Sequence, residues 1–356
     1  MSGRAGGSRR EIYMCSSRIY IYMRRRIVWL AIAAFVISLL IVSAAAMLAF
    51  WPSTSATSTS ASTSASAASV VTVASAGGAG TYVNPVFPNL ADPGCIRVGS
   101  TYYVSGTQRG GFDVFASGNL RDWTTAAASG NGTGQGGCSQ CWAPAFVGIG
   151  SKFYMAFTDG SSMTTSIAVA DNVTGPYTTV CHGGIPGIDG YLYVHTDGNA
   201  YCFYNAIGRG AVMACARLTP DLSAMVATQD LFTGPIAGLG QKQPTVEGPV
   251  ATLVGSTIFL TYSFNGTGPD YNVSYATSKS PFGPWKQSGV TVFPVDGSGH
   301  GGHDIVKTPS GKWAILYHTD QPSFRSLCVD QAFFDEPKLS FSVKYHAPGQ
   351  PAPLIT

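Results

Sequence analysis

The sequence has few charged side chains and almost no glutamate. Only 11% of its 356 residues are charged, and the three glutamates are Glu11, Glu247 and Glu336. Long amphipathic helices are absent after residue 51 and no heptad repeat occurs, which excludes a helical bundle or a coiled coil there. Glycine (43 residues), proline (21) and aromatic residues (12%) are plentiful. This composition is typical of many short strands joined by tight turns.

Basic charge is confined to the start of the chain. Residues 1–26 carry seven arginines and one glutamate, whereas the rest carries 14 Lys and Arg against 17 Asp and Glu. Without this tail the sequence has no basic patch, so we predict no nucleic-acid partner.

An uncharged stretch of 25 residues, Ile27–Trp51, follows three consecutive arginines at 24–26. It exceeds the roughly 20 residues that cross a bilayer, and the arginines favour a cytoplasmic N-terminus. We predict a cytoplasmic tail over 1–26 and a transmembrane signal anchor over 27–51. The protein would be a single-pass type II membrane protein with a lumenal or extracellular domain. The alternative is a signal peptide cleaved near the small residues Ala44–Ala46, which would leave the protein secreted.

Residues 52–80 are rich in Ser, Thr and Ala and cannot build a hydrophobic core. We expect a disordered, stalk-like linker there and a folded domain over 81–356. Four Asn-X-Ser/Thr sequons in the folded part agree with the secretory pathway and predict a glycoprotein. They begin at Asn131, Asn172, Asn265 and Asn272.

Seven of the eight cysteines lie beyond the predicted anchor, so at least one of them has no partner within the chain. Cys138 and Cys141 form a CxxC pair, but no second CxxC and no ligand-spaced histidine pair accompanies them. In an oxidising compartment this pattern favours disulfides over a metal site, either between these two cysteines or with others.

A glycine followed by aromatic or β-branched residues recurs five times in the folded part, at intervals of 51, 48, 57 and 56 residues. These intervals match one four-stranded propeller blade. A second signal, a small-residue strand followed by a turn and an aromatic residue, recurs in phase at Trp123, Tyr177 and Trp285. The two phased repeats predict an all-β, five-bladed β-propeller, because a β-sandwich has no reason to repeat in this way. The five glycines are Gly99, Gly150, Gly198, Gly255 and Gly311.

Seven to nine residues before each of these glycines stands a side chain suited to binding or chemistry. If the strands are equivalent, the five side chains converge on the propeller axis. A single aspartate before Pro93 or Gly190 is also typical of a turn, but repetition in equivalent strands favours a site. The five residues are Asp92, Trp142, Asp189, Glu247 and His303.

The motifs resemble those of glycoside hydrolase family 43. They are ADPG around Asp92, CWAP around Trp142, GIDG around Asp189, VEGP around Glu247 and GGHD around His303, and the resemblance runs from about Asn84 to about Phe334. It implies a five-bladed propeller that hydrolyses arabinosyl, xylosyl or galactosyl linkages with inversion. We therefore expect a glycosidase acting on α-L-arabinofuranosyl or related pentosyl linkages in plant oligo- or polysaccharides, as in hemicellulose degradation.

The resemblance also implies roles for three carboxyl groups. Asp92 would be the general base and Glu247 the general acid, while Asp189 would raise the pKa of Glu247 and hold it in position. Inverting hydrolysis needs an acid and a base roughly 6.5–9.5 Å apart. Residues on different blades that face a common channel can meet this requirement.

Three further residues complete the predicted site. Trp142 would form an apolar wall for the sugar, and Arg325 would contact the sugar in the catalytic subsite. His303 would bind a cation through water or hydrogen-bond the site. Ordinary packing, a salt bridge and a buried core histidine are the respective alternatives. The resemblance implies no required cofactor and allows a calcium or sodium ion on the axis.

One departure from the family pattern is Ala145, which stands where an acidic residue commonly follows WAP. It keeps open a carbohydrate-binding propeller without catalysis. The predicted anchor and stalk keep open a third function, an interaction platform at a membrane surface. All three carboxyl groups are present, which favours the enzyme. The sequence leaves the oligomeric state open.

Overall fold

The computed structural model describes residues 71–73, 76–128, 138–210, 212–320 and 325–355. The predicted tail, the predicted anchor and most of the predicted linker lie outside the described residues. In the described segments no helix is long and apolar enough to cross a membrane. All the described residues lie in the compact unit Ala67–Thr356.

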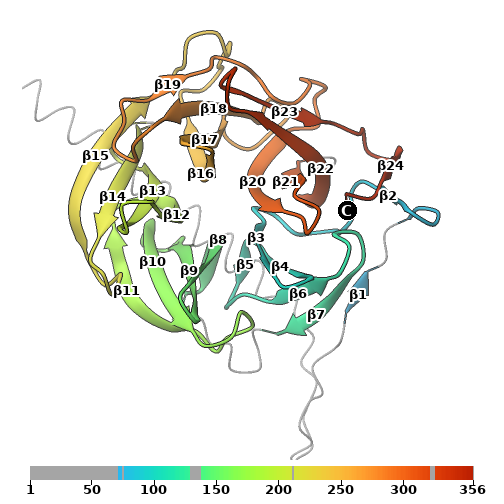
Figure 1. Ribbon diagram of the computed structural model, residues 1–356, viewed down its shortest axis with the longest axis horizontal. Coiled ribbons are helices and arrows are strands. Elements are labelled where there is room, and N and C mark those ends of the chain that lie inside the picture. The colour runs from blue at the N-terminus through green and yellow to red at the C-terminus, as the bar shows by residue number, and fades with distance from the viewer. Residues whose placement is uncertain (1–70, 74–75, 129–137, 211, 321–324, 356) are drawn as a thin grey trace, which may run out of the picture. The chain divides into compact units, whose positions relative to one another are not determined.

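Five antiparallel sheets, the blades, stand around a common axis (Figure 1). The first strand of each blade packs against the first strand of the next, from β3 through β8, β12, β16 and β20 back to β3. The structure thus confirms the five-bladed propeller. Blade 1 contains β3 (Gly94–Val98), β4 (Thr101–Ser105), β6 (Val114–Ser117) and β7 (Trp123–Ala127); blade 2 contains β8 (Gln140–Ile149), β9 (Lys152–Asp159), β10 (Thr164–Ala170) and β11 (Thr178–Ile185).

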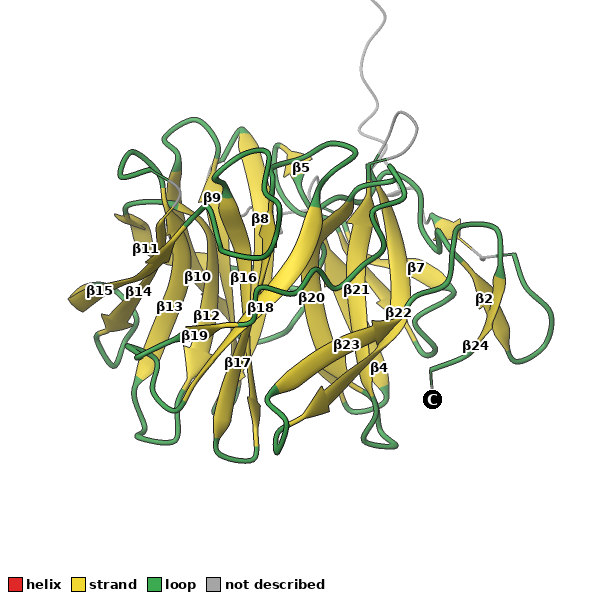
Figure 2. Cartoon of the chain, turned by 90° about the horizontal axis from the view of Figure 1, so that it is seen from above, coloured by secondary structure: helices red, strands yellow, loops and turns green. Residues whose placement is uncertain are grey.

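The remaining blades follow the same order, and Figure 2 shows their strands standing side by side. Blade 3 contains β12 (Ile188–Val194), β13 (Ala200–Ala206), β14 (Val212–Leu218) and β15 (Met225–Thr233). Blade 4 contains β16 (Val246–Val254), β17 (Thr257–Phe264), β18 (Asn272–Ser278) and β19 (Lys286–Gln287). Blade 5 contains β20 (His300–Lys307), β21 (Trp313–Thr319), β22 (Ser326–Asp335) and β23 (Ser340–Lys344).

Both sequence repeats have a structural cause. The five repeat glycines all adopt positive φ, between 58° and 87°, in the turn between the first and second strands of a blade. The aromatic residues of the second repeat lie at the start of the outermost strand in blades 1, 2 and 4. The buried apolar residues form five clusters, one between each pair of adjacent blades.

Two short strands extend blades 1 and 2. β1 (Thr72–Val73) pairs with β7 on the outer edge of blade 1, although these residues belong to the predicted linker. This pairing covers an otherwise open strand edge with two residues of high β-propensity. β5 (Gln108–Arg109) leaves blade 1 and pairs with β8 of blade 2.

The segment before blade 1 closes the ring against blade 5. β2 (Thr81–Val83) pairs with β24 (Pro351–Pro353), the last strand of the chain. The Asn84 side chain, 1% exposed, donates to the Val329 carbonyl at 3.1 Å and accepts the Val329 N–H at 2.9 Å. An amide side chain thus replaces a strand pairing at the seam between the first and last blades.

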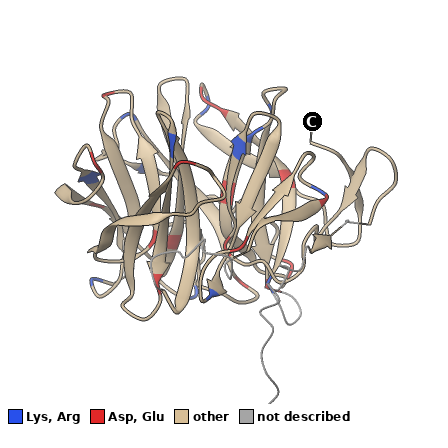
Figure 3. Cartoon of the chain, turned by 90° about the horizontal axis from the view of Figure 1, so that it is seen from below, with Lys and Arg blue, Asp and Glu red and all other residues tan. Residues whose placement is uncertain are grey.

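Charged residues are sparse on the propeller, and Figure 3 shows basic and acidic residues interspersed. No continuous basic face is visible in this view of the described residues.

Candidate active site

One residue with positive φ lies at or just before the start of the first strand in every blade. These residues are Asp92, Ala143, Asp189, Gly248 and Gly302, with φ between 42° and 56°. In blades 2 to 5 the register with the second strand shifts at this point. Four of the five residues are Asp or Gly, to which the left-handed conformation is more accessible than to most residues.

A belt of five hydrogen bonds fixes these residues. Each donates its backbone N–H to a side chain of the preceding blade. The acceptors are His318 Nδ1 for Asp92 (3.1 Å), Thr107 Oγ1 for Ala143 (3.0 Å), Thr158 Oγ1 for Asp189 (2.8 Å), Asp189 Oδ2 for Gly248 (3.1 Å) and Ser263 Oγ for Gly302 (3.0 Å). Every blade therefore holds the start of the next one, and Asp189 takes part twice.

This belt corrects the expectation that the five predicted residues occupy equivalent positions. Only Asp92 and Asp189 are structurally equivalent. Trp142 and Glu247 come one residue before the belt position, and His303 comes one residue after it. Trp142 and Glu247 still share a pocket with Asp92 and Asp189, whereas His303 does not line that pocket.

Five of the six predicted site residues line one pocket of about 290 Å³. They come from blades 1 to 4 and from the start of β22, although their positions span more than 230 residues of sequence. Three carboxyl groups therefore share one pocket with an arginine and a tryptophan. The predicted residues are Asp92, Trp142, Asp189, Glu247 and Arg325; Thr107, Ile188, Thr267 and Tyr271 complete the lining.

The Asp92 carboxylate is held from two sides. Arg325 Nη1 donates to both of its oxygens, at 3.2 and 3.0 Å, and Thr107 Oγ1 donates to Oδ2 at 2.5 Å. Its backbone N–H is bound to His318. An anchored carboxylate of this kind can accept a proton from water without losing its position.

Glu247 has the electrostatics of a proton donor. Burial, followed by the charge of Asp92, raises the pKa of Glu247 to about 7, against hydrogen bonding from Tyr271 and the charge of Arg325, which lower it. The carboxyl group therefore carries its proton in mildly acidic solution. Asp189 was the predicted source of the charge that raises the pKa of Glu247, whereas Asp92 is the carboxylate that contributes most.

Burial raises the pKa of Asp189 well above the usual range. The charges of Glu247 and Asp92 add to this effect, and the Gly248 N–H opposes it. Because Gly248 directly follows Glu247, the Asp189 carboxyl group fixes the backbone that carries Glu247. Asp189 is thus well placed to position Glu247.

Trp142 forms a wall of the pocket because a glycine lies behind it. A Cβ atom on Gly160 would come within 2.4 Å of the indole ring. The indole ring therefore lies close against the Gly160 backbone, and Trp142 also lines the pocket. Arg325 is 32% exposed, and its guanidinium lies at the pocket wall beside Asp92.

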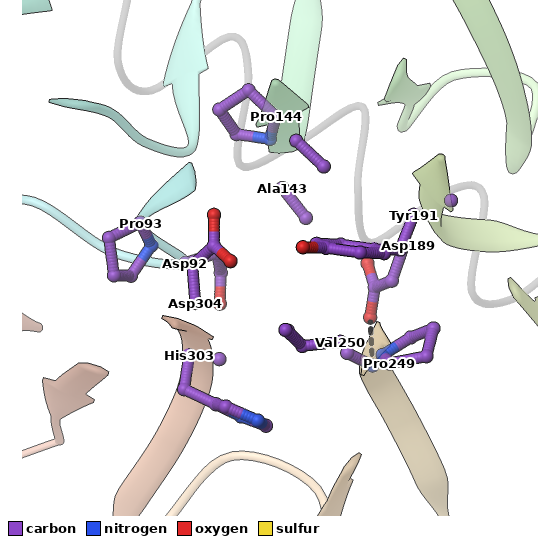
Figure 4. A pocket seen from close by; sticks show the side chains of 14 residues that line it. Asp92, Pro93, Ala143, Pro144, Asp189, Tyr191, Pro249, Val250, His303 and Asp304 are labelled. Atoms are coloured by element: carbon purple, nitrogen blue, oxygen red, sulfur yellow. Dashed lines mark hydrogen bonds between the residues drawn. The ribbon is translucent and has the colours of Figure 1, made fainter. Parts of the chain in front are cut away.

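His303 lies apart from these residues, in a cavity of about 30 Å³ on the propeller axis (Figure 4). Asp92 and Asp189 border both spaces, and Ala145 lines only the axial one. His303 Nε2 is 2.7 Å from the Thr261 hydroxyl, while Nδ1 has no partner in the described part of the chain. Burial lowers the pKa of His303 to about 3, so the ring is neutral.

These features bear on the predicted axial cation. No cluster of three or more His, Cys, Asp or Glu residues suited to a metal occurs among the described residues. The cavity has room for a water molecule, and the neutral His303 Nδ1 can accept a hydrogen bond from it. His303 Nδ1 is therefore available to a water molecule, and a calcium or sodium ion on the axis remains a prediction.

Two residues that support the site, His318 and Tyr271, were not predicted from the sequence. His318 is fully buried, accepts the Asp92 N–H and lies 3.5 Å through Nε2 from Asp320 Oδ1. Its ring stacks on Tyr271, with centroids 5.6 Å apart, and Tyr271 hydrogen-bonds Glu247. His318 thus touches the backbone of one catalytic candidate and the partner of the other.

Other predicted features are also located. Cys138 and Cys141 form a disulfide with each other, and the five other described cysteines are free and buried. The sequon residues Asn265 and Asn272 are buried, and their amide nitrogens donate inside the fold to Asp270 and Phe293. Asn172 is exposed. Asn131 lies outside the described residues.

A five-bladed propeller that brings carboxyl groups from three blades into one pocket has the kind of groups that glycoside hydrolysis needs. The chain belongs to glycosyl hydrolases family 43, whose pattern matches residues 82–335.

Relatives of known name agree with this assignment. The chain is 26% identical over 295 residues to the β-D-galactofuranosidase xynD of Aspergillus niger, covering 71% of this chain and 82% of that protein. It is 22% identical over 275 residues to a putative β-xylosidase of Escherichia coli K12, covering 67% of this chain and 49% of that protein. The chain thus spans about half the length of the bacterial relative.

Solved structures share the fold. A thermostable family-43 glycoside hydrolase superimposes with a TM-score of 0.66 and 25% identity, covering 76% of this chain and 99% of that one. An endo-1,4-β-xylanase of Bacteroides thetaiotaomicron does so with a TM-score of 0.63 and 23% identity, covering 74% and 97%. The propeller accounts for nearly all of both structures.

Proposed function

We propose that this chain is an inverting glycosidase that hydrolyses α-L-arabinofuranosyl or related pentosyl linkages in plant-type polysaccharides. The observation that carries the proposal is the shared pocket of Asp92, Asp189 and Glu247. The relatives named for galactofuranosides and xylosides support a pentose or furanose substrate.

In the proposed reaction a water molecule attacks the anomeric carbon and gives its proton to Asp92. The bond from the anomeric carbon to the leaving oxygen breaks, and Glu247 donates its proton to that oxygen. Arg325 and Thr107 hold the base in place, and Asp189 holds the backbone of the acid. Trp142 borders the bound sugar, and Arg325 is in reach of it.

Two other functions are tested by the same preparation. A carbohydrate-binding propeller would bind such sugars without turnover. An interaction platform would have no need of three carboxyl groups in one pocket, and the raised pKa of Glu247 argues against both.

The experiment is a screen of the purified protein against 4-nitrophenyl α-L-arabinofuranoside, β-D-xylopyranoside and β-D-galactofuranoside, and against arabinan. NMR records the anomeric form of the first product. We expect turnover of at least one pentoside with inverted configuration. Retention would exclude the two-carboxylate inverting scheme, and binding without turnover would favour the binding module.

We also propose that residues 27–51 anchor the protein as a type II membrane protein, with secretion after cleavage as the alternative. The charge-free stretch after three arginines supports the anchor. Membrane fractionation, with protease protection of the propeller in sealed vesicles, tests this topology. Release of the propeller into the medium would favour cleavage.

A further inference from the structure

A second hollow, the side pocket, adjoins the catalytic pocket, which is the pocket of about 290 Å³ that Asp92 and Glu247 line. Its volume is about 330 Å³, similar to that of the catalytic pocket, and Thr107 lines both. The side pocket lies between the segment before blade 1 and the loop that carries β5, which Figure 1 shows between blades 1 and 2. Together the two hollows fall within the range of roughly 300–1,000 Å³ typical of ligand sites.

The floor of the side pocket is apolar and fixed. The Phe87 and Phe115 rings pack with their centroids 4.6 Å apart, and both side chains are 7% exposed. Leu90 lies beside them, and all three belong to the apolar cluster that joins blades 1 and 5. Because this cluster is part of the core, the floor of the pocket is in place before any ligand binds.

Polar groups without partners surround this apolar floor. Gln108 Oε1 accepts the Asp113 N–H at 2.9 Å, which orients the Gln108 amide. Within the described ranges, Gln108 Nε2, the Arg109 guanidinium and the Asn89 side chain have no hydrogen bond or ion pair. An apolar floor with a few convergent polar groups is the composition of a site for a hydroxyl-rich ligand. The Asp113 carboxylate beside Arg109 favours a neutral ligand over an anionic one.

The position of the side pocket indicates which part of the substrate enters it. In an inverting enzyme the base stands opposite the leaving group, so the leaving sugar departs toward Glu247. Thr107, the wall that the two pockets share, hydrogen-bonds Asp92. The side pocket therefore adjoins the Asp92 side of the catalytic pocket.

We propose that the side pocket is a subsite for a second, neutral sugar unit of the substrate, one that precedes the sugar at the cleaved bond. Arg109 and Gln108 donate hydrogen bonds to its hydroxyl oxygens, and its apolar face rests on the two phenylalanines. This proposal rests on the proposed function and specifies the substrate further, as a chain of at least two sugars on the non-leaving side.

The test compares 4-nitrophenyl glycosides of one pentose and of the corresponding disaccharide, which share one leaving group. The measured quantity is the ratio of kcat/KM for the disaccharide to kcat/KM for the monosaccharide. We expect a ratio above one for the wild type and a roughly tenfold fall of this ratio in Arg109→Ala, the scale of one hydrogen bond to a charged donor. Gln108→Ala should lower the ratio less.

Arg209→Ala is the matched control, because Arg209 is an exposed arginine that pairs with Asp230 on blade 3 and lines neither pocket. It should leave the ratio unchanged. An unchanged ratio in Arg109→Ala and Gln108→Ala would overturn the subsite, while wild-type turnover would keep the proposed function. If the wild type turned over neither glycoside, the proposed function itself would be refuted. A loss seen only with sugar leaving groups would overturn the assignment to the non-leaving side.

Discussion

Replacing Glu247 by glutamine removes a proton donor and, in alkaline solution, a buried charge. The pKa of Glu247 rises from its ordinary 4.5 to about 7 in the folded protein. Ionisation therefore destabilises the fold. The cost is absent below about pH 4.5, grows as the pH rises and is complete above about pH 7. This difference corresponds to at most about 3 kcal/mol, because Glu247 is not wholly shielded from water.

The Glu247→Gln variant should therefore be more stable than the wild type at pH 8 and equally stable at pH 4. Thermal unfolding at the two pH values measures this difference. Activity should change in the opposite direction, because proton donation contributes about 10²–10⁴-fold in rate. The loss should be large with a sugar leaving group and small with a 2,4-dinitrophenyl group, which departs without a proton. The fall in wild-type kcat/KM above about pH 7 should vanish in the variant.

Glu336→Gln provides the control, because its pKa is shifted in the opposite direction. Hydrogen bonds, first from Thr257, lower the pKa of Glu336 to about 2. This carboxylate contributes stability above about pH 4.5 that is lost as the pH falls toward 2, so its variant should lose stability at pH 8 and keep its activity. Equal losses of Glu247→Gln with both leaving groups would refute its role as the acid.

Three further predictions concern residues around the site. Asp189→Asn keeps an oxygen for the Gly248 N–H and should be more stable than the wild type above neutral pH. Asp189→Ala loses this acceptor and should be about 1 kcal/mol less stable in thermal unfolding. The opposite order of stabilities would contradict the belt. His318→Asn keeps an acceptor for the Asp92 N–H and should retain more kcat than His318→Leu, with similar KM; equal kcat would show that His318 does not position Asp92. Peptide mass spectrometry should find no glycan on Asn265 or Asn272, whose amides are buried, and a glycan there would contradict the fold.

The fold was predictable because its repeat has a local cause. A positive-φ glycine ends the first strand of each blade, and an outer aromatic residue marks the last one in three blades. Both signals depend on neighbouring residues only. The ring closure by Asn84 depends on a contact with Val329, 245 residues away. No local pattern indicates that contact, and the asparagine resembles any turn residue before a proline.

The site was predictable in part. Counting back from the turn glycines assumes strands of equal register, and the register shifts in the inner strands make this count wrong by one residue. The motifs themselves located Asp92, Asp189 and Glu247. The belt acceptors Thr107, Thr158 and Ser263 each end one of the repeats, but threonine and serine are so common in strands that their role was invisible.

The belt also explains why the catalytic candidates depend on the whole ring. The Asp92 backbone is held by His318 of blade 5, so its position requires that the last blade close against the first. Glu247 precedes Gly248, which is held by Asp189 of blade 3. In blades 1, 2 and 4 a threonine, a threonine and a serine accept the bond to the next blade, whereas blade 3 uses the Asp189 carboxyl group itself. One carboxyl group therefore holds two blades together and takes part in the proposed mechanism, and we expect a change at Asp189 to affect both.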